Sequence, residues 1–174
     1  MDFNQDYFAL FGLQPGFAVD ADQLDQAYRA VQVEIHPDRF AHAGEAEQRL
    51  AMQWATRVNE AYQTLKNPFE RARYLLKGQG IDVLDANNTS MPAEFLIEQM
   101  EWREALAHAV GKGDHAALHG LEQDTRAQAK RLFGEIGKAL DETRDFAAAA
   151  QALRKYRFLD KFLADIDAAY EELD

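Results

Sequence analysis

Apolar side chains recur at helical spacing through most of the chain, and no run shows the β-branched alternation of a half-buried strand. We therefore expect an all-α fold. The stretch from Asp20 to His36 is the clearest case. Asp20 is a good N-cap, and Gln23 three residues later completes a capping-box pattern. The residue before Pro37 is pushed away from helical backbone angles, so the helix is predicted to end at His36. Its apolar stripe consists of Leu24, Ala27, Tyr28, Val31 and Ile35.

Three further helices complete the first part of the chain. A short one at about residues 6–11 ends at Gly12, a long one spans about 46–65, and a short one covers "PFERARYLLK". Two facing helices joined by a proline-bearing loop predict an antiparallel hairpin. The side chains placed on one face of the long helix are Leu50, Trp54, Val58, Ala61, Tyr62 and Leu65.

The segment "GQGIDVLDANNTSMP" has the composition of a linker. Helical segments follow at about 92–110, 114–143 and 146–173, separated by "GKGD" and by a loop around Arg144. This order predicts a three-helix antiparallel bundle. We expect an N-terminal domain at 1–77, a linker at 78–91 and the bundle at 92–174.

The helix at 92–110 has two apolar faces rather than one. A core stripe is formed by Phe95, Trp102, Leu106 and Ala109, whereas the opposite side carries a second set of apolar and acidic residues. That second face either packs on the first domain or the linker, or it is exposed as a protein-binding surface rimmed by acids. Its members are Leu96, Ile97, Met100, Glu101 and Glu104.

The last helix shows a similar irregularity. Phe158 falls about 100° or more from the centre of the core stripe by helical-wheel geometry, next to Arg157, and is a candidate hot spot for binding. The core stripe itself is Leu159, Leu163, Ile166 and Tyr170, with Tyr156 at its edge. The middle helix has one clean stripe, formed by Leu118, Leu121, Leu132, Phe133, Ile136 and Leu140.

Composition narrows the possible partners. The net charge is −11, with a net of −3 on residues 1–78 and −8 on the remainder, so nucleic acid or an anionic membrane is not expected as a partner. The chain has no cysteine, which excludes disulfides and thiolate ligation of zinc or an iron–sulfur cluster. The opening "MDFNQDYFALFGL" does not resemble a signal peptide, and no apolar run reaches the roughly 18 residues of a membrane span. We expect a cytoplasmic protein.

The loop "HPDRF" allows three interpretations. It can be a helix end punctuated by proline, a metal or acid–base site built on His36, Asp38 and His42, or a recognition loop. In the last case Pro37 fixes the backbone at the tip of the hairpin, so that the flanking imidazole and carboxylate reach a partner with little entropy left to lose.

The frame around this loop favours recognition. The opening "DYFALFGL", the capped helix ending in "HPDRF" and the long helix bearing "NEAYQTL" resemble the J domain of DnaJ-like co-chaperones. This resemblance implies that residues 1–77 form a J domain that contacts an ATPase chaperone. J domains commonly carry a basic second helix, but Arg29 is the only cation in "QLDQAYRAVQVEI", which weakens electrostatic steering. The residues expected to contact the chaperone are His36, Pro37, Asp38, Arg39 and Arg29.

The resemblance continues through "RARYLL", "FLIEQMEWREAL" and "LRKYRFLDKF", which are similar to the HscB family of J-proteins in bacterial iron–sulfur cluster assembly. It implies two partners, the ATPase chaperone HscA and the scaffold protein IscU, and no catalytic residue, metal or cofactor of its own. The implied scaffold-binding residues are Leu96, Ile97, Met100, Glu101, Glu104, Arg157 and Phe158. The alternative is a general J-domain co-chaperone for other clients, although the zinc-binding cysteines or Gly/Phe-rich linker frequent in such proteins are missing from the sequence.

Overall fold

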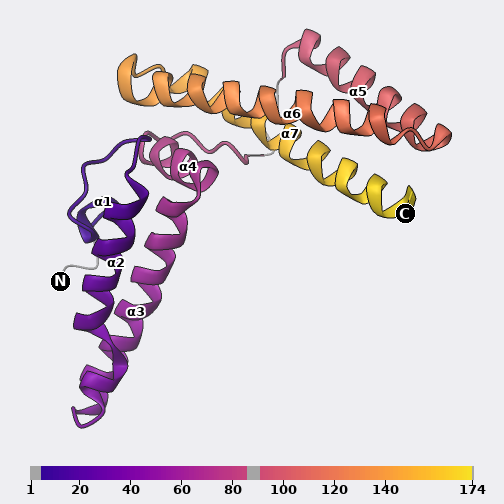
Figure 1. The fold of residues 1–174 in the computed structure, drawn as a ribbon. Coiled ribbons are helices and arrows are strands. Elements are labelled where there is room, and N and C mark those ends of the chain that lie inside the picture. The colour runs from indigo at the N-terminus through magenta and orange to yellow at the C-terminus, as the bar shows by residue number, and fades with distance from the viewer. Residues whose placement is uncertain (1–4, 86–90, 174) are drawn as a thin grey trace. The chain divides into compact units, whose positions relative to one another are not determined.

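The computed structural model describes residues 5–85 and 91–173, and this part of the chain is helical and contains no strand (Figure 1). The expected all-α fold is confirmed. The chain divides into two compact units, Met1–Gly78 and Gln79–Asp174, which are described separately. Of the predicted linker at 78–91, residues 86–90 lie outside the described part.

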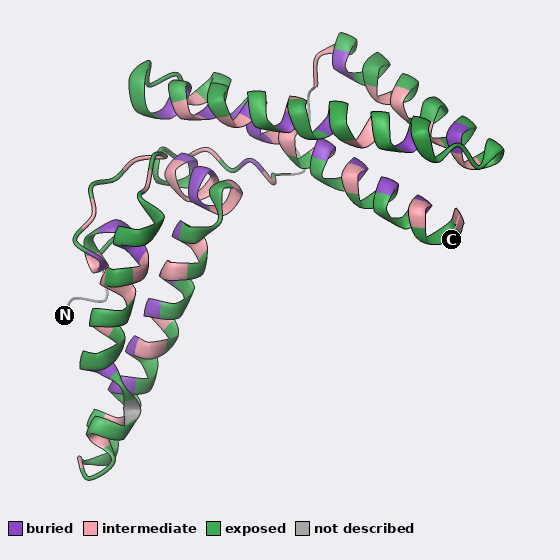
Figure 2. Ribbon diagram, in the orientation of Figure 1, coloured by how far each residue is buried: buried purple, intermediate pink, exposed green. Residues whose placement is uncertain are grey.

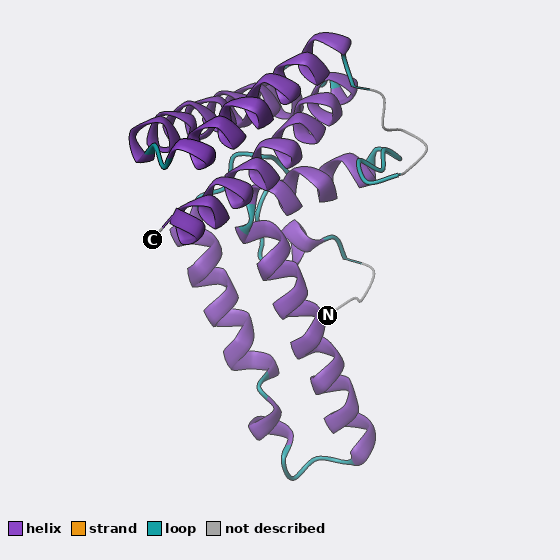
Figure 3. Ribbon diagram, turned by 90° about the vertical axis from the view of Figure 1, so that its right-hand side faces the viewer, coloured by secondary structure: helices purple, strands orange, loops and turns teal. Residues whose placement is uncertain are grey.

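The first unit is built on a helical hairpin. It contains α1 (Tyr7–Leu10), α2 (Ala21–Ile35), the 3₁₀ turn η1 (Pro37–Phe40), α3 (Glu45–Lys66) and α4 (Pro68–Gly78). The two long helices, α2 and α3, run side by side with η1 and the following loop at the tip (Figure 3). The predicted cap of α2 is present, because Asp20 Oδ1 accepts hydrogen bonds from the backbone N–H groups of Asp22 and Gln23 at 2.9 and 3.1 Å.

The core of the first unit lies between α2 and α3 and is closed by α1 and α4. The rings of Tyr28 and Tyr62 stack across the two helices with centroids 3.9 Å apart. Leu50, predicted to face this core, is 46% exposed, so that prediction was wrong. The buried stripe of α3 has alternating spacings of three and four residues, which one helix face keeps over several turns, and it starts one residue later. Its members are Ala51, Trp54, Val58, Ala61 and Leu65.

The second unit is the predicted bundle. It contains α5 (Ala93–Lys112), α6 (His115–Gly137), the π-helical turn η2 (Lys138–Glu142) and α7 (Phe146–Leu173). α5 ends at Lys112, two residues beyond the predicted end of this helix, and Gly113 follows it in the left-handed region with φ 62°. The predicted loop around Arg144 is present, and Arg144 itself has φ 56°. The most extensive packing in the bundle is between α6 and α7.

Burial within the bundle follows the predicted stripes and extends beyond them. Phe95 and Ala109 on α5, Leu118 and Ile136 on α6, and Ile166 on α7 are all buried. Figure 2 shows buried positions along each of these three helices. On α7 the predicted stripe leaves out Leu153 and Phe162, both of which are buried. The ring of Phe162 stacks on that of Trp102 with centroids 5.9 Å apart.

Candidate functional site

The first candidate site is the turn at the tip of the hairpin. α2 ends at Ile35, and His36 then caps η1, because its Nδ1 accepts a hydrogen bond from the backbone N–H of Asp38 at 3.3 Å. Pro37 begins η1, and its side chain lies outside the described part. The side chains of His36 and Asp38 are 57% and 91% exposed. The turn therefore holds a carboxylate and an imidazole in solvent on a short, hydrogen-bonded backbone.

The imidazole of His36 has two alternative partners in this turn. Its Nδ1 lies 3.3 Å from the Asp38 backbone nitrogen and 3.5 Å from Asp38 Oδ2. Accepting from the backbone N–H requires a lone pair on Nδ1, whereas an ion pair with the carboxylate requires a proton there. The two contacts therefore exclude each other, and when Nδ1 accepts from the backbone N–H the Asp38 carboxylate is left available for an external cation.

Arg39 is turned back onto the preceding helix. Its Nη1 donates to the carbonyl oxygen of Val33 at 3.1 Å and to that of Glu34 at 3.5 Å. These carbonyls belong to the last turn of α2, where backbone acceptors lack partners within the helix and a positive charge is favourable. Arg39 thus fixes η1 against the end of α2.

Arg29, the other predicted cation, is exposed on α2, one turn after Asp25. Asp25 belongs to a polar network that ties α2 to α3. The hydroxyl of Tyr62 donates to Asp25 Oδ1 at 2.8 Å, and Lys66 Nζ donates to that hydroxyl at 2.6 Å. The hydrogen bond from Tyr62 is the main cause that lowers the pKa of Asp25, and the bond to Tyr62 is the main cause that raises the pKa of Lys66.

The second candidate site is the outer face of α5. Leu96, Ile97 and Met100 are 47%, 57% and 64% exposed, and the acidic Glu101 and Glu104 beside them are also exposed. A single exposed apolar residue is ordinary. Three of them within about one and a half helical turns form a patch of the kind that marks a binding surface. On the predicted core face of α5, Phe95 and Ala109 are buried, and Trp102 and Leu106 are partly buried.

Phe158 connects this patch to the bundle core. It is half-buried rather than fully off the core, because its ring stands edge-on to that of Phe95 at 5.8 Å and stacks on that of Trp102 at 6.3 Å. The guanidinium of Arg103 lies over the same ring at 5.6 Å. Arg157, its neighbour, is exposed on α7. The structure therefore brings Phe158 next to α5, where the predicted scaffold-binding residues lie.

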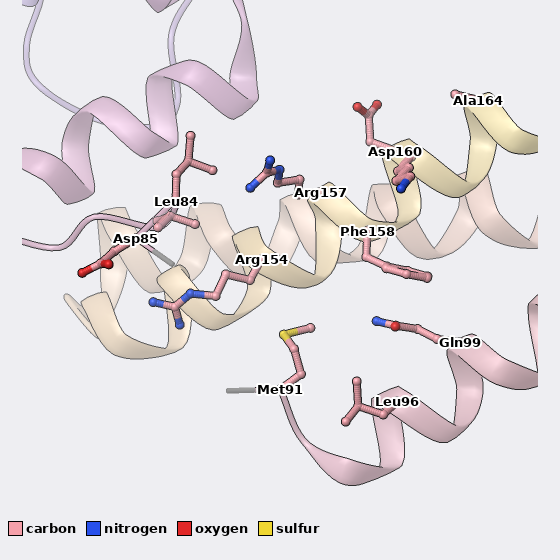
Figure 4. Close-up of a pocket in the computed structure, with 12 residues that line it drawn as sticks. Leu84, Asp85, Met91, Leu96, Gln99, Arg154, Arg157, Phe158, Asp160 and Ala164 are labelled. Atoms are coloured by element: carbon pink, nitrogen blue, oxygen red, sulfur yellow. The ribbon is translucent and has the colours of Figure 1, made fainter. Parts of the chain in front are cut away.

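Sequence reasoning missed a pocket beside Phe158, because its walls come from three separate segments. It has a volume of about 520 Å³ and lies between α5, α7 and the chain just before and after residues 86–90 (Figure 4). Leu96 reaches it from α5, and Leu84 and Met91 reach it from the segments that flank the bundle. The charged residues of its wall are Asp85, Arg154, Arg157, Asp160 and Lys161.

The structure also bears on two other features, a metal site and a membrane-spanning helix. Among residues 5–85 and 91–173, no group of three or more His, Cys, Asp and Glu side chains could hold a metal ion, so His36, Asp38 and His42 are not assembled into one. No helix in the same part of the chain has the length and apolar character needed to cross a membrane.

Comparisons with known proteins identify the families that the two parts of the chain match. Residues 6–74 match the family described as DnaJ domain, and residues 91–167 match the HSCB C-terminal oligomerisation domain. The co-chaperone protein HscB homolog of Aromatoleum aromaticum is 47% identical over 174 residues, which is 100% of this chain and 98% of that protein. The homolog of Paraburkholderia phymatum is 48% identical over 171 residues, which is 98% of this chain and 97% of that protein.

Two solved structures of HscB proteins superpose closely on this chain. The chaperone HscB from Vibrio cholerae superposes with a TM-score of 0.83 at 36% identity and covers 98% of this chain and 100% of that one. The human co-chaperone protein HscB superposes with a TM-score of 0.87 at 33% identity and covers 97% of this chain and 83% of that one.

Proposed function

Because this chain belongs to the HscB family of J-domain co-chaperones, we propose that it binds the scaffold IscU and delivers it to the chaperone HscA. A J-domain co-chaperone works with a chaperone of the Hsp70 class, and in this proposal that chaperone is HscA. The J domain, residues 1–77, stimulates ATP hydrolysis by HscA. The bundle, residues 92–174, holds IscU, and residues 78–91 link the two. The complex acts in the cytoplasm and aids iron–sulfur cluster assembly and transfer.

The observation that carries the proposal is the geometry of the turn at His36, Pro37 and Asp38. The Asp38 carboxylate is 91% exposed on a turn that is tied to α2 through Arg39. An anion held in this way suits a charge-assisted hydrogen bond to a cation such as arginine on HscA, and little further ordering is required on binding. Arg29, exposed on α2, adds a positive charge to the same unit.

The outer face of α5 supports the second half of the proposal. Its three exposed apolar side chains and two acids form a mixed patch next to Phe158 and Arg157. An interface of this kind has an apolar centre and a polar rim. Long, unbranched Met100 can adapt its shape to the scaffold.

The chain needs no catalytic residue, metal or cofactor for this role. HscA holds the nucleotide and performs the hydrolysis, and this protein changes the rate through contacts. In the proposed order of events, the bundle brings IscU near HscA. The turn at residues 36–38 then docks on the ATPase domain and triggers hydrolysis.

Hydrolysis of ATP by HscA with this protein alone, IscU alone and both together tests the proposal. Stimulation that is much larger with both than with either one is expected. Stimulation by this protein that does not respond to IscU would instead support the alternative, a general J-domain co-chaperone for another client. An absence of stimulation in every combination would reject both.

A further inference from the structure

The pocket beside Phe158 has an uneven distribution of charge. Arg154, Arg157 and Lys161 are spaced along α7 by three and four residues, so they lie along one side of that helix, and all three line the pocket. The exposed carboxylates of Glu101 and Glu104 lie on α5 instead. The pocket wall also carries two carboxylates, those of Asp85 and Asp160, so the three cations leave its charged groups positive on balance, although the second unit as a whole is strongly acidic.

The interior of the pocket is largely apolar. Leu96 and Phe158 face it from the two helices, and Val83, Leu84 and Met91 contribute from the segments that flank residues 86–90 (Figure 4). A volume of about 520 Å³ is more than enough for one large side chain. The pocket is continuous with the outer face of α5, because Leu96 belongs to both.

One buried polar group beside the pocket lacks a hydrogen-bond partner among the described residues. This group is the Nε–H of Arg154. A buried donor without an acceptor costs free energy, which a ligand that brings an acceptor removes. Together with the cations along α7, this donor favours a negatively charged group.

We propose that this pocket receives one apolar side chain of IscU and that a carboxylate neighbouring that side chain pairs with Arg154 or Lys161. This inference rests on the proposed function, and it adds the chemistry and orientation of the bound segment. The acidic end of the segment lies toward α7, and any basic end lies toward Glu101 and Glu104 on α5. The segments at 83–85 and at Met91 are then part of the scaffold-binding site, in addition to the two helices.

Methionine methyl groups report directly on this arrangement. The chain has four methionines, and three of them lie in informative places: Met91 in the pocket wall, Met100 on the outer face of α5, and Met52 on α3 of the first unit. We would label the methionine methyl groups of the full chain with ¹³C and record their resonances while adding IscU. The Met91 and Met100 signals are expected to shift together, and the Met52 signal is expected to stay in place.

A variant that narrows the pocket tests the same inference through affinity. Ala164 lines the pocket from the exposed side of α7, so Ala164→Trp places an indole there without removing a core side chain. Ala127→Trp is the matched control, because Ala127 is exposed in the middle of α6 and lies outside the pocket. We expect Ala164→Trp to weaken IscU binding by about ten-fold or more, as for loss of a hot-spot contact, and Ala127→Trp to bind like the wild type.

Reversal of the Lys161 charge tests the orientation proposed for the bound segment. Lys161 is exposed, so Lys161→Glu is expected to leave the fold intact and to weaken binding by about five-fold, with a smaller loss at high salt. A Met100 shift without a Met91 shift, together with wild-type affinity of Ala164→Trp, would overturn the pocket but leave scaffold binding in place. If wild-type protein failed to bind IscU in the same titrations, the proposed function would fall as well.

Discussion

Arg39 donates from its guanidinium to the main-chain carbonyl of Val33 at 3.1 Å, so a residue of the exposed turn is bonded to the helix that precedes it. A second, longer contact of 3.5 Å joins the same nitrogen to the carbonyl of Glu34. The arginine next to the His36-Pro37-Asp38 turn therefore serves the geometry of the turn, and its charge is partly directed toward the C-terminus of α2.

Replacement of Arg39 separates these two contributions. Arg39→Ala removes both the bridge and the charge, and we expect it to lower stimulation of HscA at least ten-fold. Arg39→Lys keeps the charge but replaces the planar guanidinium with a single ammonium, so an intermediate activity is expected. The measurement is HscA ATP hydrolysis at saturating concentrations of each variant. Full activity of Arg39→Lys would show that charge alone is required and would contradict the bridging role.

The network of Asp25, Tyr62 and Lys66 predicts how the stability of the first unit depends on pH. The pKa of Asp25 is lowered from its usual 3.8, so its contribution is present at neutral pH and is lost as the pH falls through the folded-state pKa. The pKa of Lys66 is raised from 10.5, so its contribution is lost as the pH rises through the folded-state pKa. Tyr62→Phe removes the shared hydroxyl. It should lower stability near neutral pH and flatten the dependence at both ends.

The two tryptophans make this measurable in the full chain. Trp54 is buried in the first unit and Trp102 lies in the bundle, so Trp54 fluorescence in a Trp102→Phe background follows the first unit alone. Urea midpoints would be compared across pH. Tyr28→Phe is the control, since the Tyr28 hydroxyl donates to Asn59 and not to Asp25. An unchanged pH profile in Tyr62→Phe would show that the network has no part in stability.

Two adjacent residues of α5 are expected to have opposite roles. Phe95 is buried against Trp102 and Phe158, so Phe95→Ala should destabilise the bundle by about 3–5 kcal/mol. Leu96 is 47% exposed, so Leu96→Ala should change stability by less than about 0.5 kcal/mol and still weaken IscU binding. Thermal unfolding by circular dichroism and calorimetric titration with IscU measure the two effects. Wild-type affinity of a variant with both Leu96→Ala and Met100→Ala would contradict the role of this face.

Phe158 is less suitable for such a test, and the reason is structural. Its ring contacts those of Phe95 and Trp102, so its truncation would remove core packing as well as any contact with the scaffold. Loss of binding in Phe158→Ala would therefore have two possible causes.

Much of the fold could be predicted because the relevant signals are local. The Asp20 cap and the helix end before Pro37 each depend on a few neighbouring residues. Leu50 was misplaced because the spacing of four residues to Trp54 suits a helical face, whereas the core stripe follows alternating spacings that start at Ala51. Phe162 was missed because the predicted stripe of α7 was drawn too narrow to include it.

The candidate sites also differ in how far their residues could be predicted from the sequence. The turn at residues 36–38 and the outer face of α5 lie within continuous stretches, so sequence reasoning could identify their residues. The pocket depends on tertiary packing, since Lys161 is far in sequence from Leu84 and Leu96 and meets them only in the folded bundle. The position of Arg39 against the end of α2 also depends on a contact between a side chain and a carbonyl that no residue pattern specifies.

The central claim is that one end of the protein triggers the chaperone while the other binds the scaffold. Single-turnover ATP hydrolysis by HscA, with wild-type protein or Asp38→Asn and with or without IscU, tests it most directly when IscU affinity is measured on the same samples. We predict that Asp38→Asn abolishes stimulation and keeps wild-type affinity for IscU, because residues 36–38 and the proposed scaffold site belong to different units. Undiminished stimulation by Asp38→Asn, or loss of stimulation and IscU binding together, would contradict this account.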